Sequence, residues 1–142
     1  MVPPTQPGSI TLITSTGRVA RPTPFTGGGL ILPWGVAVDG HNNVWVANFG
    51  HQRLSEFCGV DATACPPGDH AGSPISPSSG YAFDGLTRNT GVQIDPSGNA
   101  WVANNWKNKP LPDANPGGYE IVAFVGVAGP VRTPLIGPPR TP

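Results

Sequence analysis

The sequence is poor in charged residues. Charged side chains make up 11% of its 142 residues, and eight Lys and Arg residues balance eight Asp and Glu residues. A chain without net charge has no long-range field that attracts nucleic acid or an anionic membrane, so we expect neither as a partner. No apolar run approaches the roughly 20 residues that cross a bilayer. The residues after Met1 lack the basic start and the apolar stretch of a signal peptide. We expect no export signal in this chain, and the cellular compartment stays open.

Cysteine is almost as scarce. Cys58 and Cys65 are the only two cysteines, and they enclose six residues. In an oxidising compartment this pair is expected to form a disulfide, and in a reducing one it is expected to remain two free thiols. Both alternatives stay open. A zinc site is not expected, because the sequence holds no second Cys pair or His pair at a suitable spacing.

The motifs of familiar enzymes are missing too. The sequence has no Gly-x-Ser-x-Gly elbow, no Walker loop and no His-Glu-x-x-His motif. Glycines 27–29 precede an apolar run with no helix after it, which favours a flexible turn over a phosphate cradle. No segment keeps a helical period over about ten residues, so the sequence predicts an all-β protein.

Glycine and proline are abundant, at 20 and 19 residues, beside four Trp and five Phe. Frequent turn residues with enough aromatics to form a core indicate short strands separated by many turns. We expect an ordered loop with few contacts at residues 59–80, an insertion at 105–118, and an extended proline-rich tail at 130–142.

A repeat organises the chain. Residues 35–48 recur 56 positions later as residues 91–104, with Gly, Val, Asp, Asn, Trp, Val, Ala and Asn in the same register. Each copy predicts a hairpin, because aliphatic residues alternate in its first strand and Asp, Gly and Asn fill its turn. Asp39 and Asp95 are predicted to cap these turns.

The repeat also extends to a third strand. Residues 52–57 and 119–124 are predicted third strands, and residues 9–14 would be the third strand of an incomplete blade at the start of the chain. Trp45 and Trp101 recur inside strands and are predicted core residues. Arg53 and Glu56 alternate with apolar neighbours and are predicted to lie on the solvated face.

Gly-Val-Ala-Val-Asp, a short turn, Asn-Val-Trp-Val-Ala-Asn and a strand ending in Phe resemble NHL-repeat β-propellers. The resemblance covers residues 31–57 and 89–126, and more weakly 9–17. It is nearest to the virginiamycin B lyase-like branch, and the gluconolactonase and paraoxonase propellers are more distant. It implies a partial propeller of about two and a half four-stranded blades. The expected organisation is a partial propeller at 1–129, with a blade remnant at 9–30 and blades at 31–88 and 89–129, followed by the tail at 130–142.

Fewer than three blades do not close a ring. Either two or three copies assemble, as a homodimer or homotrimer that completes the ring, or the chain is the C-terminal part of a longer propeller protein. Proteins of the resembled family are often exported, so the resemblance leaves an extracellular compartment open.

Hairpin geometry predicts a candidate site. The start of each first strand and the end of each second strand share one end of the molecule, where neutral amide oxygens and carboxylates would suit Ca²⁺. The candidate calcium ligands are Asn48, Asn89, Asn104, Asp84 and Asp113. The alternative is that the asparagines satisfy backbone groups of turns. His51 is the candidate general base, or else an exposed loop residue, and the predicted substrate-binding residues are Trp34, Trp106 and Asn105.

The resemblance implies a function that the residues alone do not define. In the related lactonases a calcium ion polarises the carbonyl of a lactone or ester, so the chain is expected to be a calcium-assisted hydrolase of such small molecules. A lyase that opens a cyclic ester by elimination is a variant. The alternative from another class is a non-catalytic propeller that binds a protein or glycan partner.

Overall fold

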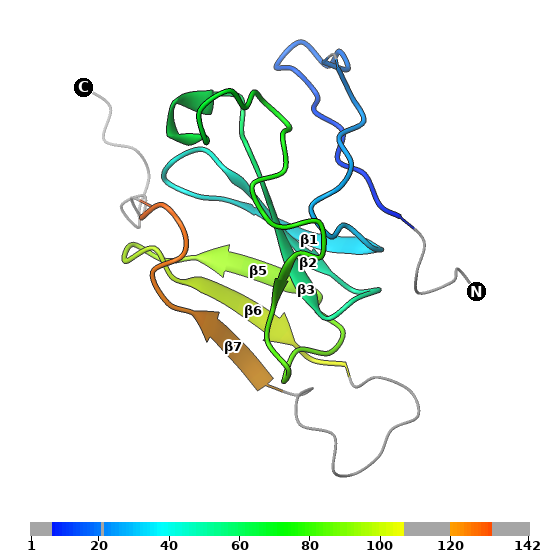
Figure 1. Cartoon of the computed structure of the whole chain (residues 1–142), viewed down its shortest axis with the longest axis vertical. Helices are drawn as coiled ribbons and strands as arrows, with labels where there is room; N and C mark the ends of the chain where they lie inside the picture. The colour runs from blue at the N-terminus through cyan, green and yellow to red at the C-terminus, as the bar shows by residue number, and fades with distance from the viewer. Residues whose placement is uncertain (1–6, 21, 107–119, 132–142) are drawn as a thin grey trace.

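The computed structural model describes residues 7–20, 22–106 and 120–131. These residues form two antiparallel sheets that pack against each other (Figure 1). The first sheet contains β1 (Pro33–Val38), β2 (Val44–Asn48), β3 (Arg53–Phe57) and β4 (Tyr81–Ala82) in that order, and the second contains β5 (Gly91–Ile94), β6 (Ala100–Asn104) and β7 (Glu120–Phe124). In the described part of the chain the only helical segment is a single 3₁₀ turn, Ala62–Ala64. The predicted all-β class is confirmed, and the two sheets fit a partial propeller.

None of the described residues forms a helix that is long and apolar enough to cross a membrane.

Aspartates close both hairpins of the repeat. Oδ1 of Asp39 accepts the backbone N–H groups of His41 and Asn43, and Oδ1 of Asp95 accepts those of Ser97 and Asn99, all within 2.8–2.9 Å. The second carboxylate oxygen of each aspartate accepts the indole N–H of the following tryptophan. The predicted turn caps are confirmed.

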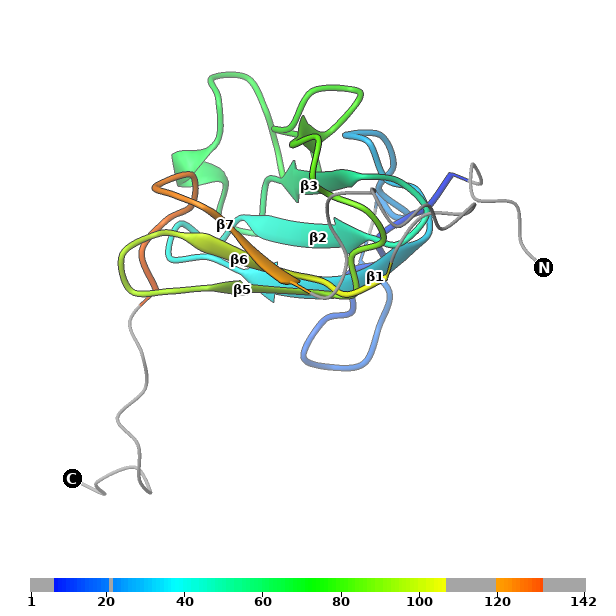
Figure 2. The same ribbon diagram turned by 90° about the horizontal axis from the view of Figure 1, so that it is seen from below.

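The main core lies between the two sheets (Figure 2). Strand alternation turns Trp45, Ala47 and Leu54 toward the second sheet, which contributes Val92 and Val102. All five side chains are at least 97% buried, and burial of each large apolar side chain contributes about 1.5–3 kcal/mol. The packing of the two repeat copies on each other therefore supplies the largest part of the apolar burial.

Gly35 lets the backbones of β1 and β5 approach each other. A Cβ atom at Gly35 would lie 2.6 Å from the carbonyl oxygen of Thr90 and 2.8 Å from Cα of Gly91. No ordinary contact is this short, so a side chain at Gly35 would push the sheets apart.

The segment after β7 ties the turns of the two hairpins together. Gly129 donates its N–H to Oδ2 of Asp39 and accepts the N–H of Gly40, each at 2.9 Å. Ala128 donates to the carbonyl of Gly98 in the other turn at 3.0 Å. The start of the predicted tail belongs to this clasp, because Val131 packs against the main core. Residues 132–142 lie outside the described residues.

The predicted strand at 9–14 does not join a sheet, and this prediction was wrong. The segment turns back on itself through isolated bridges, Ile10 with Phe25 and Ile13 with Val19. Ile10 then packs on the outer face of the first sheet, against Leu30 and Phe57. No neighbouring strand is available at that position, so the backbone groups pair within the segment itself.

The loop at 59–80 is better anchored than expected. Cys58 and Cys65 form a disulfide with a Cα–Cα distance of 5.7 Å, which decides between the two alternatives left by the sequence. Ser76 is 95% buried; its Oγ donates to the carbonyl of Gly28 and accepts the N–H of Glu56. The expectation of few contacts was wrong. After this loop β4 pairs with β3 and gives the first sheet its fourth strand.

Two further predictions about burial were wrong. Trp101 is 44% exposed, whereas its repeat counterpart Trp45 is completely buried. Glu56 is 95% buried and accepts hydrogen bonds from the hydroxyl of Tyr81 at 2.8 Å and from Nδ2 of Asn43 at 3.1 Å. Glu56 shares the face of Trp45, which the second sheet covers, and Trp101 has no third sheet over it. Arg53, predicted to be solvated, is half-buried.

Candidate functional site

The candidate residues do gather at one end of the two sheets. Pro33 pairs with Asn48 where β1 begins and β2 ends, and the hydroxyl of Thr90 donates to Oδ1 of Asn105 at 2.6 Å at the corresponding place in the second sheet. Antiparallel pairing brings these strand ends together, as the hairpin pattern predicts.

Asn48 is fully used by the protein. Its Oδ1 accepts the N–H of Ile31 at 2.9 Å, and its Nδ2 donates to Oγ of Ser55 at 3.0 Å and to the carbonyl of Arg53 at 3.2 Å. The side chain fastens the segment before β1 to the ends of β2 and β3. This is the structural alternative that the sequence left open.

Asn104 has the same role in the second repeat. Its Oδ1 accepts the N–H of Thr87 at 2.8 Å, and Thr87 is the repeat counterpart of Ile31. Its Nδ2 donates to the carbonyl of Gly85 at 2.9 Å and to Oε1 of Glu120 at 3.2 Å. The recurrence of Asn at these two positions is therefore explained by local backbone satisfaction.

Asn89 differs from the other two asparagines. It is completely buried, and its Nδ2 donates to the carbonyl of Arg53 at 3.4 Å across the two sheets. Its Oδ1 has no hydrogen-bond partner among the described residues, and neither have Nδ1 of His51 and Nε of Arg53. Buried polar atoms are rarely left without a partner, so this group of residues invites a ligand or water.

His51 lies two residues beyond Phe49 and is half-buried. Burial lowers the pKa of its imidazole, and the positive charge of Arg53 lowers it further. The imidazole is therefore uncharged at neutral pH and can accept a proton or a hydrogen bond through its unpartnered Nδ1.

The described residues do not make a calcium site by themselves. Asn48 and Asn104 already accept protein hydrogen bonds, Asp84 is exposed, and Asp113 lies outside the described residues. Among residues 7–20, 22–106 and 120–131, no group of three or more His, Cys, Asp or Glu side chains is placed to hold a metal ion. Asn89 offers one free oxygen, where Ca²⁺ takes about six to eight.

An aromatic cluster occupies the same end of the molecule. The ring centroids of Trp34 and Phe49 are 4.6 Å apart, and those of Phe49 and Trp106 are 6.1 Å apart. The guanidinium carbon of Arg88 lies 5.1 Å from the Phe49 centroid. Trp34 is 65% exposed and Trp106 is 56% exposed. We call these four residues the aromatic end.

The sequence predicted the two tryptophans and missed Phe49 and Arg88. A signal for Phe49 was present, because it directly follows the strand-end Asn48 on the predicted face. Arg88 ends the segment that leads into the first strand of the second repeat, so the sequence placed it near this end, but its contact with the Phe49 ring could not be predicted.

The backbone holds the aromatic end in a constrained conformation. Leu32 has a positive φ of 48°, which is sterically costly for a leucine, and its carbonyl accepts the N–H of Phe49 at 3.0 Å. The pairing of β1 with β2 shifts register between Pro33 and Gly35, around Trp34. The positive φ and the register shift together fix the direction in which the backbone presents Trp34.

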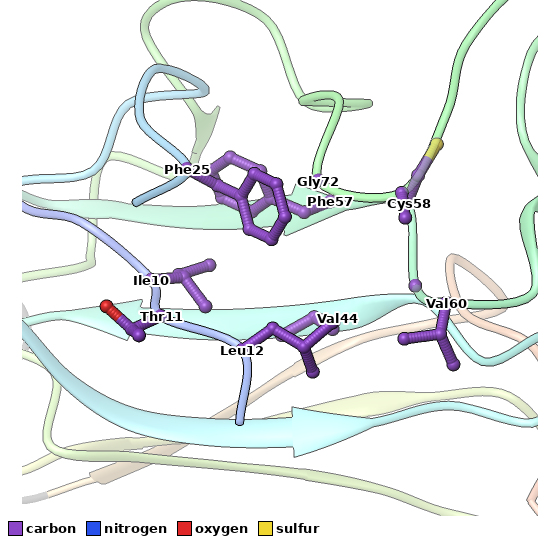
Figure 3. Close-up of a pocket in the computed structure, with 11 residues that line it drawn as sticks. Ile10, Thr11, Leu12, Phe25, Val44, Phe57, Cys58, Val60 and Gly72 are labelled. Atoms are coloured by element: carbon purple, nitrogen blue, oxygen red, sulfur yellow. The ribbon is translucent and has the colours of Figure 1, made fainter. Parts of the chain in front are cut away.

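A small apolar cavity lies elsewhere, between the N-terminal segment and the outer face of the first sheet (Figure 3). Its volume is about 200 Å³, and its lining includes Ile10, Phe25, Val44 and Phe57. Cavities that hold metabolites are generally larger and present several convergent polar groups. None of the predicted catalytic, calcium-binding or substrate-binding residues lines this cavity.

Comparison with known proteins identifies one repeat. Residues 30–57, which contain β1, β2 and β3, match the NHL repeat. Searches of the curated proteins and of the solved structures gave no match to the chain. The match over residues 30–57 and the two stacked antiparallel sheets support a β-propeller-like module that contains an NHL repeat. The nearer resemblance to the virginiamycin B lyase-like branch stays a prediction.

Proposed function

We propose that this chain is a propeller-type binding module, and that the aromatic end is its binding surface for a protein partner. The observation that carries the proposal is the row of Trp34, Phe49 and Trp106, in which two largely exposed indoles flank a ring that Arg88 covers. Tryptophan and arginine are the residues most enriched at the energetic centres of protein interfaces.

The residues of the aromatic end indicate which side chains the partner would present. An apolar side chain placed against the exposed faces of the indoles would bury aromatic area, which contributes about 25 cal/mol per Å². Arg88, which lies over Phe49, could bind a carboxylate through its planar donors. We therefore expect a peptide segment with an apolar residue beside an acidic one. The constrained backbone at Leu32 and Trp34 reduces the ordering cost of binding.

The test uses the purified chain against a displayed library of random peptides and against an array of glycans. The proposal predicts selected peptides that pair an apolar with an acidic residue. Trp34→Ala or Trp106→Ala should weaken their binding by about tenfold or more. Val19→Ala, at an exposed apolar position of the N-terminal segment, is the control and should bind as the wild type does.

Peptide binding that both tryptophan variants retain would refute the aromatic end as the binding surface. Binding to glycans alone, lost in the same variants, would refute the protein partner and assign the surface to carbohydrate.

A calcium-assisted lactone or ester hydrolase is the second candidate. The buried Oδ1 of Asn89 and Nδ1 of His51 favour it, since neither has a hydrogen-bond partner among the described residues and both lie near the predicted site. Hydrolysis of a lactone that is lost on chelation by EDTA, and lost in His51→Ala, would support this candidate over the binding module. Hydrolysis that survives complete chelation would rule out the metal mechanism.

A further inference from the structure

The packing of the two repeat copies uses two different faces. The first sheet presents the face of Gly35, Trp45 and Leu54, and the second sheet presents the face of Val92 and Val102. Because the copies are equivalent by a shift of 56 residues, each sheet also has the other kind of face. We call the first kind the tryptophan face and the second kind the valine face.

The second sheet carries a tryptophan face that no described strand covers. Trp101 is 44% exposed where Trp45 is fully buried. Ile121, which pairs with Ala103 as Leu54 pairs with Ala47, is 71% exposed where Leu54 is fully buried. The paired strand residues of this face are uncharged, and among the described residues the one charged group bound to it is Asp95, whose carboxylate accepts the indole N–H of Trp101. The members of the face are Gly91, Gln93, Trp101, Ala103, Ile121 and Ala123.

The first sheet carries the matching valine face, half of it open. Val36 is 63% exposed and Val38 is 52% exposed, whereas their counterparts Val92 and Ile94 are 3% and 9% exposed. The N-terminal segment covers β2 and β3 on this side through Ile10 but leaves β1 open. A hollow of about 220 Å³ lies beside Val36, between Trp34 and Ile10.

We propose that a second copy of this chain docks its valine face on the tryptophan face around Trp101, repeating the contact that joins the two sheets within one chain. One chain carries the tryptophan half of this contact and, on β1, the open part of the valine half, and their complementarity is already present in its own core. Val46, the counterpart of Val102, is covered by Ile10, so the contact would be made through β1. Large exposed apolar faces are rare on proteins that stay monomeric. The contact is heterologous, so successive copies add head to tail and close a ring when the rotation permits.

A substitution at Gly91 should disturb the proposed contact without disturbing the fold of the single chain. Within the chain, a Cβ at Gly91 would meet only Cβ of Ala103, at an ordinary 3.6 Å. Its repeat counterpart Gly35, however, lies against the backbone of Thr90 and Gly91. In the proposed contact Gly91 would lie in the same way against Trp34 and Gly35 of the second copy. A single methyl group at Gly91 should therefore block docking and leave the fold of each chain intact.

The experiment is sedimentation velocity of the wild type and Gly91→Ala over a range of concentrations. The wild type should shift from monomer to multiples of the chain mass as concentration rises. Gly91→Ala should keep the same circular dichroism and melting curve in dilute solution and associate about tenfold more weakly or worse. Val19→Lys, which removes an exposed apolar residue outside both faces, should associate like the wild type.

A mixing experiment tests the head-to-tail arrangement. Gly91→Ala keeps its valine face, and Val36→Lys keeps its tryptophan face, so neither variant should self-associate but their mixture should form a one-to-one complex. A wild type that remains monomeric overturns the proposal and assigns the tryptophan face to another occupant, such as a blade of a different chain. Equal association of wild type and Gly91→Ala, or a mixture that stays monomeric, overturns it as well.

Discussion

At the scale of single residues, repeated identity does not mean repeated environment. Asn48 and Asn104 perform the same backbone-satisfying role in both copies, because their partners are local and recur with them. Trp45 and Trp101 also recur, and both donate to the preceding aspartate, yet one is buried and the other is exposed. Local hydrogen bonding is encoded in the repeat, and burial depends on the neighbouring sheet.

Residue-level roles could be predicted from the sequence only where they are local. Asp39 and Asp95 were recognisable as turn caps, since the turn and tryptophan groups that they bind lie within six positions along the chain. The further bond from Gly129 to Asp39 spans 90 positions and could not be predicted. Phe49 and Arg88 were not recognisable as a pair, because their contact joins two strand ends that lie 39 positions apart in the sequence. The burial of Glu56 could not be predicted either, because its partner Tyr81 lies 25 positions away, after a long loop.

Glu56 makes stability depend on pH. Burial raises the pKa of its carboxyl above the usual 4.5, although hydrogen bonds from Tyr81 and Asn43 partly oppose this. The folded state therefore binds the proton more tightly than the unfolded state. The free energy of unfolding should fall as pH rises from 4.5 through the raised folded-state pKa, and the loss is complete above it.

Glu56→Gln removes this titration. Urea unfolding of both proteins between about pH 4 and about pH 7 should show the variant gaining stability relative to the wild type as pH rises. The test is how the difference in unfolding free energy between variant and wild type changes with pH. Its absolute size is not informative, because the amide accepts hydrogen bonds differently from the carboxylate. A difference that is constant with pH, or that slopes the other way, would contradict the account.

At the scale of elements, hairpins and third strands could be predicted, and the connections could not. β3 and β7 lie within the predicted ranges because alternating residues mark strands wherever a partner strand is adjacent. Residues 9–14 have a similar alternating pattern, but the residues that lie beside them form only isolated bridges and no strand. The loop at 59–80 was underestimated, because its anchoring through Ser73 and Ser76 relies on distant backbone groups.

The disulfide stabilises this loop. Cys58 and Cys65 lie seven positions apart, and closing so short a loop in the unfolded chain contributes about 2–3 kcal/mol in the chain-entropy model. The double variant Cys58→Ala with Cys65→Ala should lose about that much stability in urea unfolding. The wild type kept under a thiol reductant should lose a similar amount. Unchanged midpoints in both experiments would show that the bridge constrains nothing.

At the scale of the whole molecule, the repeat predicts two blades, and the structure shows how they pack. The propeller-like stacking places the tryptophan face of one sheet on the valine face of the next, and the clasp at Gly129 joins their turns. The sequence could not say which copies of these faces are covered, because that depends on how many blades stand side by side. The same stacking brings the strand ends together, and the aromatic end with them.

The stacking of the two blades is tested most directly by a matched pair of glycine substitutions, compared by urea unfolding in dilute solution. Gly35→Ala places a methyl group against the backbone of β5 and should lower the free energy of unfolding by about 1–3 kcal/mol. Gly91→Ala makes the same chemical change at the equivalent position of the second repeat, where space is open, and should stay within about 0.5 kcal/mol of the wild type. Equal effects of the two substitutions would contradict the packing of β1 on β5, and with it the account of the molecule as two stacked blades.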